Sequence, residues 1–452
     1  MKINKLMAVV LCLMLMGMIM PSFNISYSAS AETPIWDGTC NTDWYDSEAT
    51  ELRISTAEEL AGMAQLVNSG KTMEGQTIYL DDDIYLNDVS NYENWEIEAP
   101  ANSWTPIGKD KTYYFDGVFD CQGHNINGLY SKESVHASYT AYAGFFGCNG
   151  ANSVIKNVSL DFGYVTYSYK GNFGFYSSET GQEHHYLGGI SAYNAAGTIA
   201  ECAYNGTIKA DVYYSLTTSA NYRLNNYSGA ICGYNASGII SDCLATGNIF
   251  ADISCLVSSA GDYSGYVMEY TGGICGYNQT GEIKRCGNRA SVTNTTSCDG
   301  NGNVYSGGIC GYGEGNSFTV SECYNLGTIT SSDAASINSG GICGYATRIY
   351  FIDNCYNWGD ITVSNVDRGY AGGIVGYTIG YTTAASGSIE YSYTNVYNTG
   401  RISADEYASG TLGYISETTL LPVMNNCYYL VDNSTTGIGN STENTILKPV
   451  TK

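Results

Sequence analysis

The chain has 452 residues, of which 54 are Gly, 42 are Tyr and 16 are Cys but only 6 are Pro, and its formal net charge is −24. The glycine has no triplet period and little proline accompanies it, which excludes a collagen, while 44% hydrophobic residues exclude a disordered acidic tail. The 19 Lys and Arg are scattered, which argues against a nucleic-acid partner.

Residues 1–31 have the pattern of a secretory signal peptide. Lys2 and Lys5 precede an apolar run over 6–20, which is short for a bilayer span, and residues 29–31 form a small-x-small cleavage site. We expect this segment to be removed, which leaves an exported protein with no transmembrane segment in the mature chain. A retained membrane anchor is the alternative.

Residues 32–110 are predicted to form an N-terminal cap and the first coils of the fold. Two overlapping capping boxes begin at Ser55 and Thr56, and apolar residues then recur at helical spacing as far as Gly70. This pattern predicts a capping helix over about 56–69. A helix in this place would cover the open edge of a stack of strands.

One motif recurs about eight times between residues 143 and 414. Its best copies read Gly-Gly-Ile-Cys-Gly-Tyr, and a second element of the form Cys-Tyr-Asn-x-Gly-x-Ile follows, as over 323–329 and 355–361. Three short strands per unit with no helical period predict the coils of a stacked β-solenoid, and a β-propeller is the alternative. The second residue of each copy falls at positions 144, 189, 230, 273, 308, 341, 373 and 410.

The repeat positions predict distinct structural roles. Glycine suits a corner with positive φ or a close approach of successive coils, and the Ile and Cys between the glycines are expected to point inward. The Asn of Tyr-Asn-x-Gly is expected to bond backbone groups in a turn and to form a ladder with the next Asn. The segments 209–228 and 250–271 are long, and we expect them to project as insertions from one corner.

The order of these motifs resembles the GLUG-motif repeat proteins of bacterial surfaces, whose repeats also precede the protease region of some IgA1-cleaving enzymes. The resemblance rests on Gly144-Phe145-Phe146-Gly147, on the later repeat copies and on an N-terminal set from Trp36-Asp37-Gly38 to Phe119-Asp120. It covers most of 32–430 and implies an all-β, right-handed parallel β-helix displayed outside the cell, often in adhesion. It assigns 111–430 to the repeats and leaves 431–452 as a polar C-terminal tail. Many relatives carry Val or Leu where this chain has Cys, and no region matches a protease.

Ten cysteines share two repeat positions, and five others do not. Equivalent inward positions favour ladders of free buried thiols, although a coil spacing of about 4.8 Å leaves disulfides between coils open. No Cys-x-x-Cys pair is present to seed a zinc site. The first position holds Cys232, Cys275, Cys310 and Cys343, and the second Cys202, Cys243, Cys286, Cys323, Cys355 and Cys427. The better disulfide candidates are Cys40, Cys121, Cys148, Cys255 and Cys298.

Two groups of acidic residues are candidates for a catalytic or a calcium site. Asp116, Asp120 and His124 lie at a spacing of four and could supply an acid pair for glycoside hydrolysis, but their Phe-Asp turn pattern favours a structural role. The run over 81–83, with Asp88 nearby, lacks the spaced loop of a calcium site, so a solvated strand end is favoured. No nucleophile-elbow, zincin or phosphate-loop motif occurs. The sequence therefore predicts no catalytic residue, no metal site and no cofactor.

Tyrosine is the remaining indication of a binding surface. One set follows each glycine element (193, 234, 277, 312, 345 and 377) and predicts a structural stacking ladder. A second set falls in the long segments, where polar loops would offer contact area at low entropy cost, and packing against the wall is the alternative. The predicted ligand-binding residues are Tyr213, Tyr214, Tyr222, Tyr227, Tyr263, Tyr266 and Tyr270.

The sequence thus predicts a non-catalytic, secreted or cell-surface scaffold of adhesin type, which binds a glycan or an extracellular host or matrix protein. A β-helix polysaccharide lyase or glycosidase is the enzyme alternative. A structural spacer in a larger surface protein is the third possibility.

Overall fold

The computed structural model describes residues 34–133, 140–173, 181–216, 222–257, 265–298, 301–380, 391–416, 422–430, 436–440 and 448–450. The chain divides into two compact units, Met1–Pro34 and Ile35–Lys452, and the described residues belong to the second except for Pro34. The predicted signal peptide and most of the predicted C-terminal tail lie outside the described residues.

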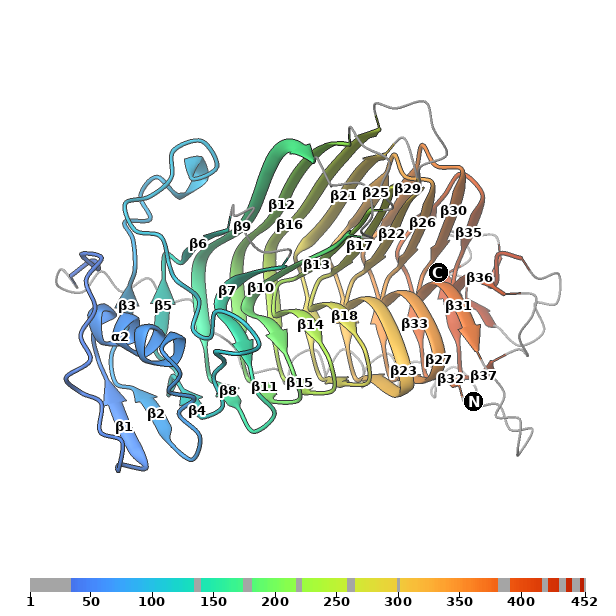
Figure 1. The fold of residues 1–452 in the computed structure, drawn as a ribbon. Helices are drawn as coiled ribbons and strands as arrows, with labels where there is room; N and C mark the ends of the chain where they lie inside the picture. Colours follow the sequence, from blue (N-terminus) through green and yellow to red (C-terminus); the bar gives the residue numbers. More distant parts are fainter. Residues whose placement is uncertain are drawn as a thin grey trace. The chain divides into compact units, whose positions relative to one another are not determined.

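The second unit is nearly all-β, and its strands form two large parallel sheets whose strands run side by side (Figure 1). Sheet A has 23 described strands and sheet B has 16. Sheet A contains β1 (Glu51–Ile54), β2 (Thr77–Leu80), β4 (Val118–Asp120), β7 (Thr140–Asn149), β8 (Val154–Lys156), β10 (Gly181–Asn194), β11 (Thr198–Ala200), β13 (Tyr222–Gly229), β14 (Cys232–Asn235), β15 (Ile239–Ser241), β17 (Gly265–Gly272), β18 (Cys275–Asn278), β19 (Glu282–Lys284), β22 (Asn301–Gly307), β23 (Cys310–Ser321), β26 (Ser336–Gly340), β27 (Cys343–Asp353), β30 (Arg368–Gly372), β31 (Val375–Gly380), β32 (Tyr391–Thr394), β35 (Tyr407–Ser409), β36 (Leu412–Ile415) and β37 (Val423–Asn425). Sheet B contains β3 (Ile84–Tyr85), β5 (Asn125–Asn127), β6 (Tyr130–Glu133), β9 (Ser159–Phe173), β12 (Ala203–Leu216), β16 (Leu244–Val257), β20 (Gly287–Asn288), β21 (Ser291–Cys298), β24 (Tyr324–Asn325), β25 (Ile329–Ser332), β28 (Tyr356–Asn357), β29 (Ile361–Ser364), β33 (Tyr397–Asn398), β34 (Ile402–Ser403), β38 (Tyr428–Leu430) and β39 (Lys448–Val450).

Successive repeat units pair in parallel through equivalent residues. Cys232 of β14 lies opposite Cys275 of β18, and Ile240 of β15 lies opposite Ile283 of β19. The same register joins β13 to β17 and β16 to β20 and β21. Residues that share a motif position therefore stack one strand apart, as the repeat predicts.

The described units contain between three and five strands, and the unit over 222–257 has four rather than the predicted three. In the unit over 222–257 these are β13, β14 and β15 of sheet A, followed by β16 of sheet B. The additional break falls at 230–231, where the chain bends directly after Gly229. The glycine motif therefore marks a bend within one sheet.

The motif glycines are required by close backbone approach and not by a positive φ. A Cβ on Gly307 would collide with the carbonyl oxygen of Cys310 in the same bend, and a Cβ on Gly308 would collide with that of Gly341 in the next unit. The positive-φ corner lies at the residue before each Cys of the second ladder, where Glu322, for example, has φ 55°. Of the two predicted roles of glycine, these positions therefore show the close approach of successive coils, and the positive-φ corner holds non-glycine residues.

The described parts of 209–228 and 250–271 form strands rather than the loops predicted. β12 and β16 each run for 14 residues, whereas β25 and β29 each have four. The reason is an alternation that suits a half-buried strand: Ile208, Ala210 and Val212 are buried, and the residues between them are not. The extra residues lengthen both sheets beside the corner where the chain crosses from sheet B to sheet A.

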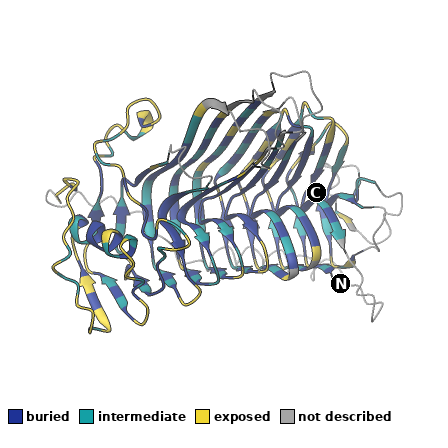
Figure 2. Ribbon diagram, in the orientation of Figure 1, coloured by how far each residue is buried: buried dark blue, intermediate teal, exposed yellow. Residues whose placement is uncertain are grey.

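One apolar cluster contains inward-facing residues of both sheets, and the buried positions follow the strands as continuous bands (Figure 2). The repeat residues Ile309, in the bend before β23, Cys310 of sheet A, and Val292 and Ile329 of sheet B are all completely buried. The predicted inward orientation of the motif Ile and Cys is confirmed.

Helix α2 (Ala57–Asn68) confirms the predicted N-terminal helix. Thr56 is its N-cap, and the Thr56–Glu59 capping box is complete because each side chain accepts a hydrogen bond from the backbone N–H of the other. Its apolar side packs into the main core through residues such as Leu60 and Met63. Among the described residues, no helix has both the length and the apolar character needed to cross a bilayer.

Buried asparagines form two ladders along the stack. In the first ladder, each Nδ2 donates to the Oδ1 of the next asparagine at 2.8 Å and to a carbonyl two residues on in its own turn. This confirms the predicted role of Asn in Tyr-Asn-x-Gly. The first ladder is Asn288, Asn325, Asn357 and Asn398. A second ladder, which the motif did not predict, is Asn149, Asn194, Asn235 and Asn278.

Replacing Asn357 with Ala is expected to lower the free energy of unfolding by roughly 2 kcal/mol, because it removes three hydrogen bonds and leaves a buried carbonyl at Gly359 without its donor. Urea unfolding measures the change. Thr362→Ala, at an exposed position of the same unit, is the matched control and should change stability by less than about 0.5 kcal/mol. Equal effects of the two substitutions would show that the ladder contributes nothing.

Candidate functional site

Two rows of stacked tyrosines cross sheet A, and we call them the first and second tyrosine rows. In the first row the ring centroids of neighbours lie 4.9–5.2 Å apart and the ring planes are within 16° of parallel. Each of these tyrosines lies two residues before the first glycine of its motif. The first row is Tyr142, Tyr186, Tyr227, Tyr270 and Tyr305.

The second row confirms the predicted stacking ladder and extends it by one residue. Its centroid separations are 4.8–5.2 Å, and its ring planes are within 17° of parallel. The even spacing follows from the parallel register, which translates each tyrosine by one strand. The second row is Tyr193, Tyr234, Tyr277, Tyr312, Tyr345, Tyr377 and Tyr414.

In the four units that carry a tyrosine of each row, the two rows meet edge to face on either side of the bend. Tyr227 and Tyr234, for example, have centroids 5.1 Å apart and planes at 87°, the geometry that aromatic quadrupoles favour. The rows form an apolar cluster separate from the main core. The first row is only 5–9% exposed, whereas Tyr193, Tyr234 and other second-row tyrosines are partly buried. Neighbours cover the ring faces, so the second row presents mainly ring edges and hydroxyl groups.

Polar groups contact the rows at several points. The ammonium of Lys111 lies 4.0 Å from the ring centroid of Tyr193, and Nδ1 of His184 lies 3.3 Å from the hydroxyl of Tyr227. Tyr234 donates to the side-chain oxygen of Gln279 at 3.2 Å.

The hydroxyl of Tyr277 donates to Glu314, which is itself paired with Arg348 at 3.1 Å. Burial, and then the hydrogen bond to Glu314, raise the pKa of Tyr277 well above its usual range. Burial likewise raises the pKa of Tyr305 to about 12. These phenols are therefore protonated at neutral pH.

The predicted ligand-binding tyrosines separate into three groups. Tyr227 and Tyr270 belong to the first row and are 6% and 7% exposed, so they are stacked in a buried row rather than carried by loops. Tyr213 of β12 is 38% exposed, and Tyr266 of β17 is half-buried beneath the guanidinium of Arg223, 6.0 Å from its ring centroid.

The side chains of the other three predicted tyrosines lie outside the described part of the structure. Tyr214 and Tyr222 fall at the ends of β12 and β13, with side chains outside the described part of the structure, and Tyr263 lies outside the described residues altogether. Tyr213 lies near the end of β12, before the crossing to β13, and Tyr266 lies at the start of β17, after the equivalent crossing from β16 in the next unit.

Asp116, Asp120 and His124 make separate structural contacts. Asp116 accepts two hydrogen bonds from Asn152, at 2.8 and 3.0 Å. Burial alone would raise the pKa of Asp120, but hydrogen bonds from Asn157 and the Gln122 backbone, with the ammonium of Lys156 at 3.1 Å, together lower it. These contacts fit the predicted structural role.

The acidic run over 81–83 begins directly after β2 and faces solvent, as predicted. Asp81 pairs with Arg53 at 2.5 Å, and Asp83 lies 3.4 Å from Nδ1 of His124. Asp88 accepts from the backbone N–H of Ser90 at 2.9 Å. Among the described residues, no three His, Cys, Asp or Glu side chains are grouped so that they could hold a metal ion.

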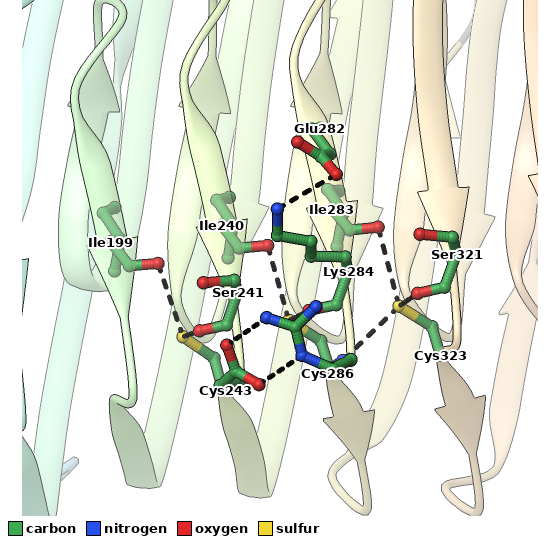
Figure 3. Close-up of polar contacts among 12 residues, drawn as sticks. Ile199, Ile240, Ser241, Cys243, Glu282, Ile283, Lys284, Cys286, Ser321 and Cys323 are labelled. Atoms are coloured by element: carbon green, nitrogen blue, oxygen red, sulfur yellow. Dashed lines mark hydrogen bonds and ion pairs between the residues drawn. The ribbon is translucent and has the colours of Figure 1, made fainter.

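The second-position cysteines form a buried ladder beside the positive-φ corner (Figure 3). Cys243 donates to the carbonyl of Ser241 at 3.1 Å, and Cys323 donates to that of Ser321 at 3.1 Å. Burial raises the pKa of both thiols well above their usual range, which keeps them unreactive. Asp242 and Arg285, two residues at this corner, form a bidentate ion pair at 2.6 and 2.7 Å, and both side chains are partly exposed.

Nine cysteines of the two ladders are free thiols: Cys202, Cys232, Cys243, Cys275, Cys286, Cys310, Cys323, Cys343 and Cys355. Of the five predicted disulfide candidates, Cys40, Cys121 and Cys148 are also free, so the structure does not support disulfides at these three. Cys148 lies opposite Tyr193 in the pairing of β7 with β10, and Cys40 and Cys121 lie outside the described strands. Cys255 lies opposite Cys298 in the pairing of β16 with β21.

A polar cluster that the sequence did not predict lies inside the core around Glu269. Glu269 is completely buried and accepts hydrogen bonds from Thr296 at 2.5 Å and Thr271 at 3.3 Å. With its amide nitrogen toward the carboxyl group, Asn294 adds a third hydrogen bond at 2.5 Å and accepts one from Ser306.

Burial raises the pKa of Glu269 to about 8, against the lowering effect of its hydrogen bonds to Thr296 and Thr271. The sequence feature that could have indicated burial of Glu269 was its position in the alternation of inward and outward residues along β17. Glu269 falls between Val267 and Thr271 in the alternation that directs side chains inward.

Trp358 is a second feature that the sequence did not single out. It occupies the x position of Tyr-Asn-x-Gly and is 61% exposed, beside Leu326 of the preceding unit at 38%. Asn turns inward in this motif, so the following residue points to solvent. A large apolar residue at the x position of this motif therefore predicts an exposed apolar side chain, as Trp358 and Leu326 show.

No protein-family model matches the chain, and no curated protein matches it either. Among solved structures, the chain is similar to a crystal structure of a putative immunoglobulin A1 protease from Bacteroides ovatus. The two are 18% identical, the match covers 87% of this chain and 85% of that chain, and the TM-score is 0.44.

Proposed function

We propose that this protein is an exported, non-catalytic scaffold of the GLUG-repeat type, a right-handed parallel β-helix whose outer tyrosines bind a glycan or an extracellular host or matrix protein. The observation that supports binding is the pair of tyrosine rows, which underlie an aromatic outer surface extending over many repeat units. Export is supported by the signal-peptide pattern of residues 1–31.

The architecture is supported by the strand register. Each described unit contributes two or three strands to sheet A and one or two to sheet B, and these strands pair in parallel with their equivalents one unit away. A β-helix coil makes these pairings, whereas a propeller blade pairs strands within a unit.

The proposed contact residues are Tyr213, on the outer side of sheet B, and Tyr266, on the outer side of sheet A, rather than the whole predicted set. Tyrosine offers a rigid aromatic body and one hydroxyl, a combination favoured at binding surfaces. Tyr213 is exposed, and Tyr266 carries the cation of Arg223 over its ring. Tyr227 and Tyr270 of sheet A are packed in the first row, where neighbours cover their ring faces, so they are not proposed as contact residues.

A panel of immobilised glycans and extracellular-matrix proteins tests this function, with new reducing ends measured on the same glycans. We expect saturable binding to at least one member and no new reducing ends. New reducing ends or unsaturated sugar ends would replace the proposal with the lyase or glycosidase alternative. Absence of any binding would favour the structural spacer.

A further inference from the structure

We propose that the tyrosine rows are an oxidative modification site, at which a one-electron oxidant joins tyrosines of neighbouring repeat units through a dityrosine bond. The inference is independent of the proposed binding function. It rests on the spacing of the rings, on a proton acceptor next to one of them and on the partial exposure of the second row.

The spacing places reactive ring positions together. Tyr277 lies between Tyr234 and Tyr312, with centroid separations of 4.8 and 4.9 Å and interplanar angles of 5° and 12°. Because the register translates each ring by one strand, each ring carbon, including those ortho to the hydroxyl, lies about one strand spacing from its counterpart in the next unit. A radical formed on one ring therefore has a coupling partner on either side.

A carboxylate next to Tyr277 can receive the phenolic proton. Removing an electron from a phenol makes its O–H strongly acidic, and the radical persists only when that proton leaves. The hydroxyl of Tyr277 already donates to Glu314, and Arg348 holds that carboxylate at 3.1 Å. Since Tyr277 is otherwise a protonated, buried phenol, Glu314 lowers the barrier to oxidation at this ring.

The second row is the point of entry for oxidation. Tyr234 and Tyr312 are partly exposed, whereas the first-row rings are almost completely buried. The edge-to-face contacts between Tyr227 and Tyr234 and between Tyr270 and Tyr277 connect the first row to the second, so a radical can also reach the buried rings.

The coupling removes two electrons and two protons from a pair of tyrosines. Tyr277 gives one electron to the oxidant and its hydroxyl proton to Glu314, and Tyr234 gives one electron to the oxidant and its hydroxyl proton to solvent. The two phenoxyl radicals form one carbon–carbon bond between ortho positions. The hydrogen on each of those carbons then moves to the phenolic oxygen, which restores both rings. The product has lost two hydrogen atoms, and a photo-oxidant such as a ruthenium tris-bipyridyl complex with persulfate accepts the two electrons.

The test oxidises the full-length folded protein with that ruthenium–persulfate couple and maps cross-linked peptides by mass spectrometry. We expect dityrosine only between register partners one repeat apart, including Tyr234–Tyr277 and Tyr277–Tyr312. Tyr277→Phe, which keeps the ring, should remove both of these cross-links and leave Tyr312–Tyr345 in place. Glu314→Gln should lower the yield at Tyr277 several-fold.

Tyr79→Phe is the matched control, because Tyr79 lies in β2 outside both rows, and it should leave the cross-link pattern unchanged. Circular dichroism verifies that each variant is folded, and Tyr227→Phe repeats the test in the first row. The proposal is overturned if no dityrosine forms, if cross-links join tyrosines that are not register partners, or if urea-unfolded protein gives the same pattern. An unchanged yield in Glu314→Gln would overturn the role of the proton acceptor.

Discussion

Replacing Gly307 with Ala is expected to destabilise the protein by at least about 4 kcal/mol. The added Cβ would collide with the carbonyl oxygen and carbon of Cys310 in the same bend, and it would also press on the backbone nitrogen of Gly344 in the next unit. Backbone atoms held by strand pairing on both sides cannot move aside as a side chain can. Urea unfolding, or the soluble yield if the variant does not fold, measures the effect.

Gly369→Ala is the matched control for this substitution. Its Cβ would approach only side-chain methyl groups, those of Val363 and Val366, which can shift by rotation. We expect a cost of no more than about 1 kcal/mol. If Gly307→Ala destabilised the protein as little as Gly369→Ala, the close backbone approach in the bend between β22 and β23 would be contradicted.

Stability is expected to fall as pH rises from about 4.5 to about 8, because of Glu269. The folded protein holds the carboxyl proton up to a pKa of about 8, whereas the unfolded chain releases it near 4.5. Between these values the folded state binds more protons, so the free energy of unfolding decreases with pH. At 1.36 kcal/mol per pH unit the full loss is roughly 5 kcal/mol, and it is complete above pH 8.

Glu269→Gln isolates this contribution from other titrating groups in the core. His185, whose pKa is lowered by burial, titrates in wild type and variant alike. The variant should match the wild type near pH 4.5 and should exceed its stability by several kcal/mol at pH 9. Urea unfolding at a series of pH values gives both curves, and parallel curves would contradict the assignment of the buried proton to Glu269.

The stacking of equivalent residues could be predicted because a repeat with parallel register moves every side chain by one strand. The ladders at Asn325 and Asn357 and the row through Tyr277 and Tyr312 follow from that rule alone. Helix α2 could be predicted because its cap at Thr56 is a local pattern.

Other features depend on backbone geometry that the motif does not encode. The first tyrosine row packs against the second only because the chain bends after Gly229, and the pattern of Gly-Gly-Ile is equally compatible with an outer corner. Glu322 occupies a positive-φ corner that composition would assign to glycine or asparagine. The length of β12 depends on its partners β9 and β16 continuing beside it, which a single segment does not reveal.

The most direct test of the proposed binding surface is the Kd of the Tyr213→Ser, Tyr266→Ser double variant for the tightest partner found on the glycan and matrix-protein panel. Tyr79→Ser is the control, because the guanidinium of Arg53 lies over that ring at 5.0 Å much as Arg223 lies over Tyr266. We predict that the double variant binds at least about tenfold more weakly, a loss of about 1.4 kcal/mol, while the control binds as the wild type does. A folded double variant with the wild-type Kd would contradict the assignment of binding to these tyrosines.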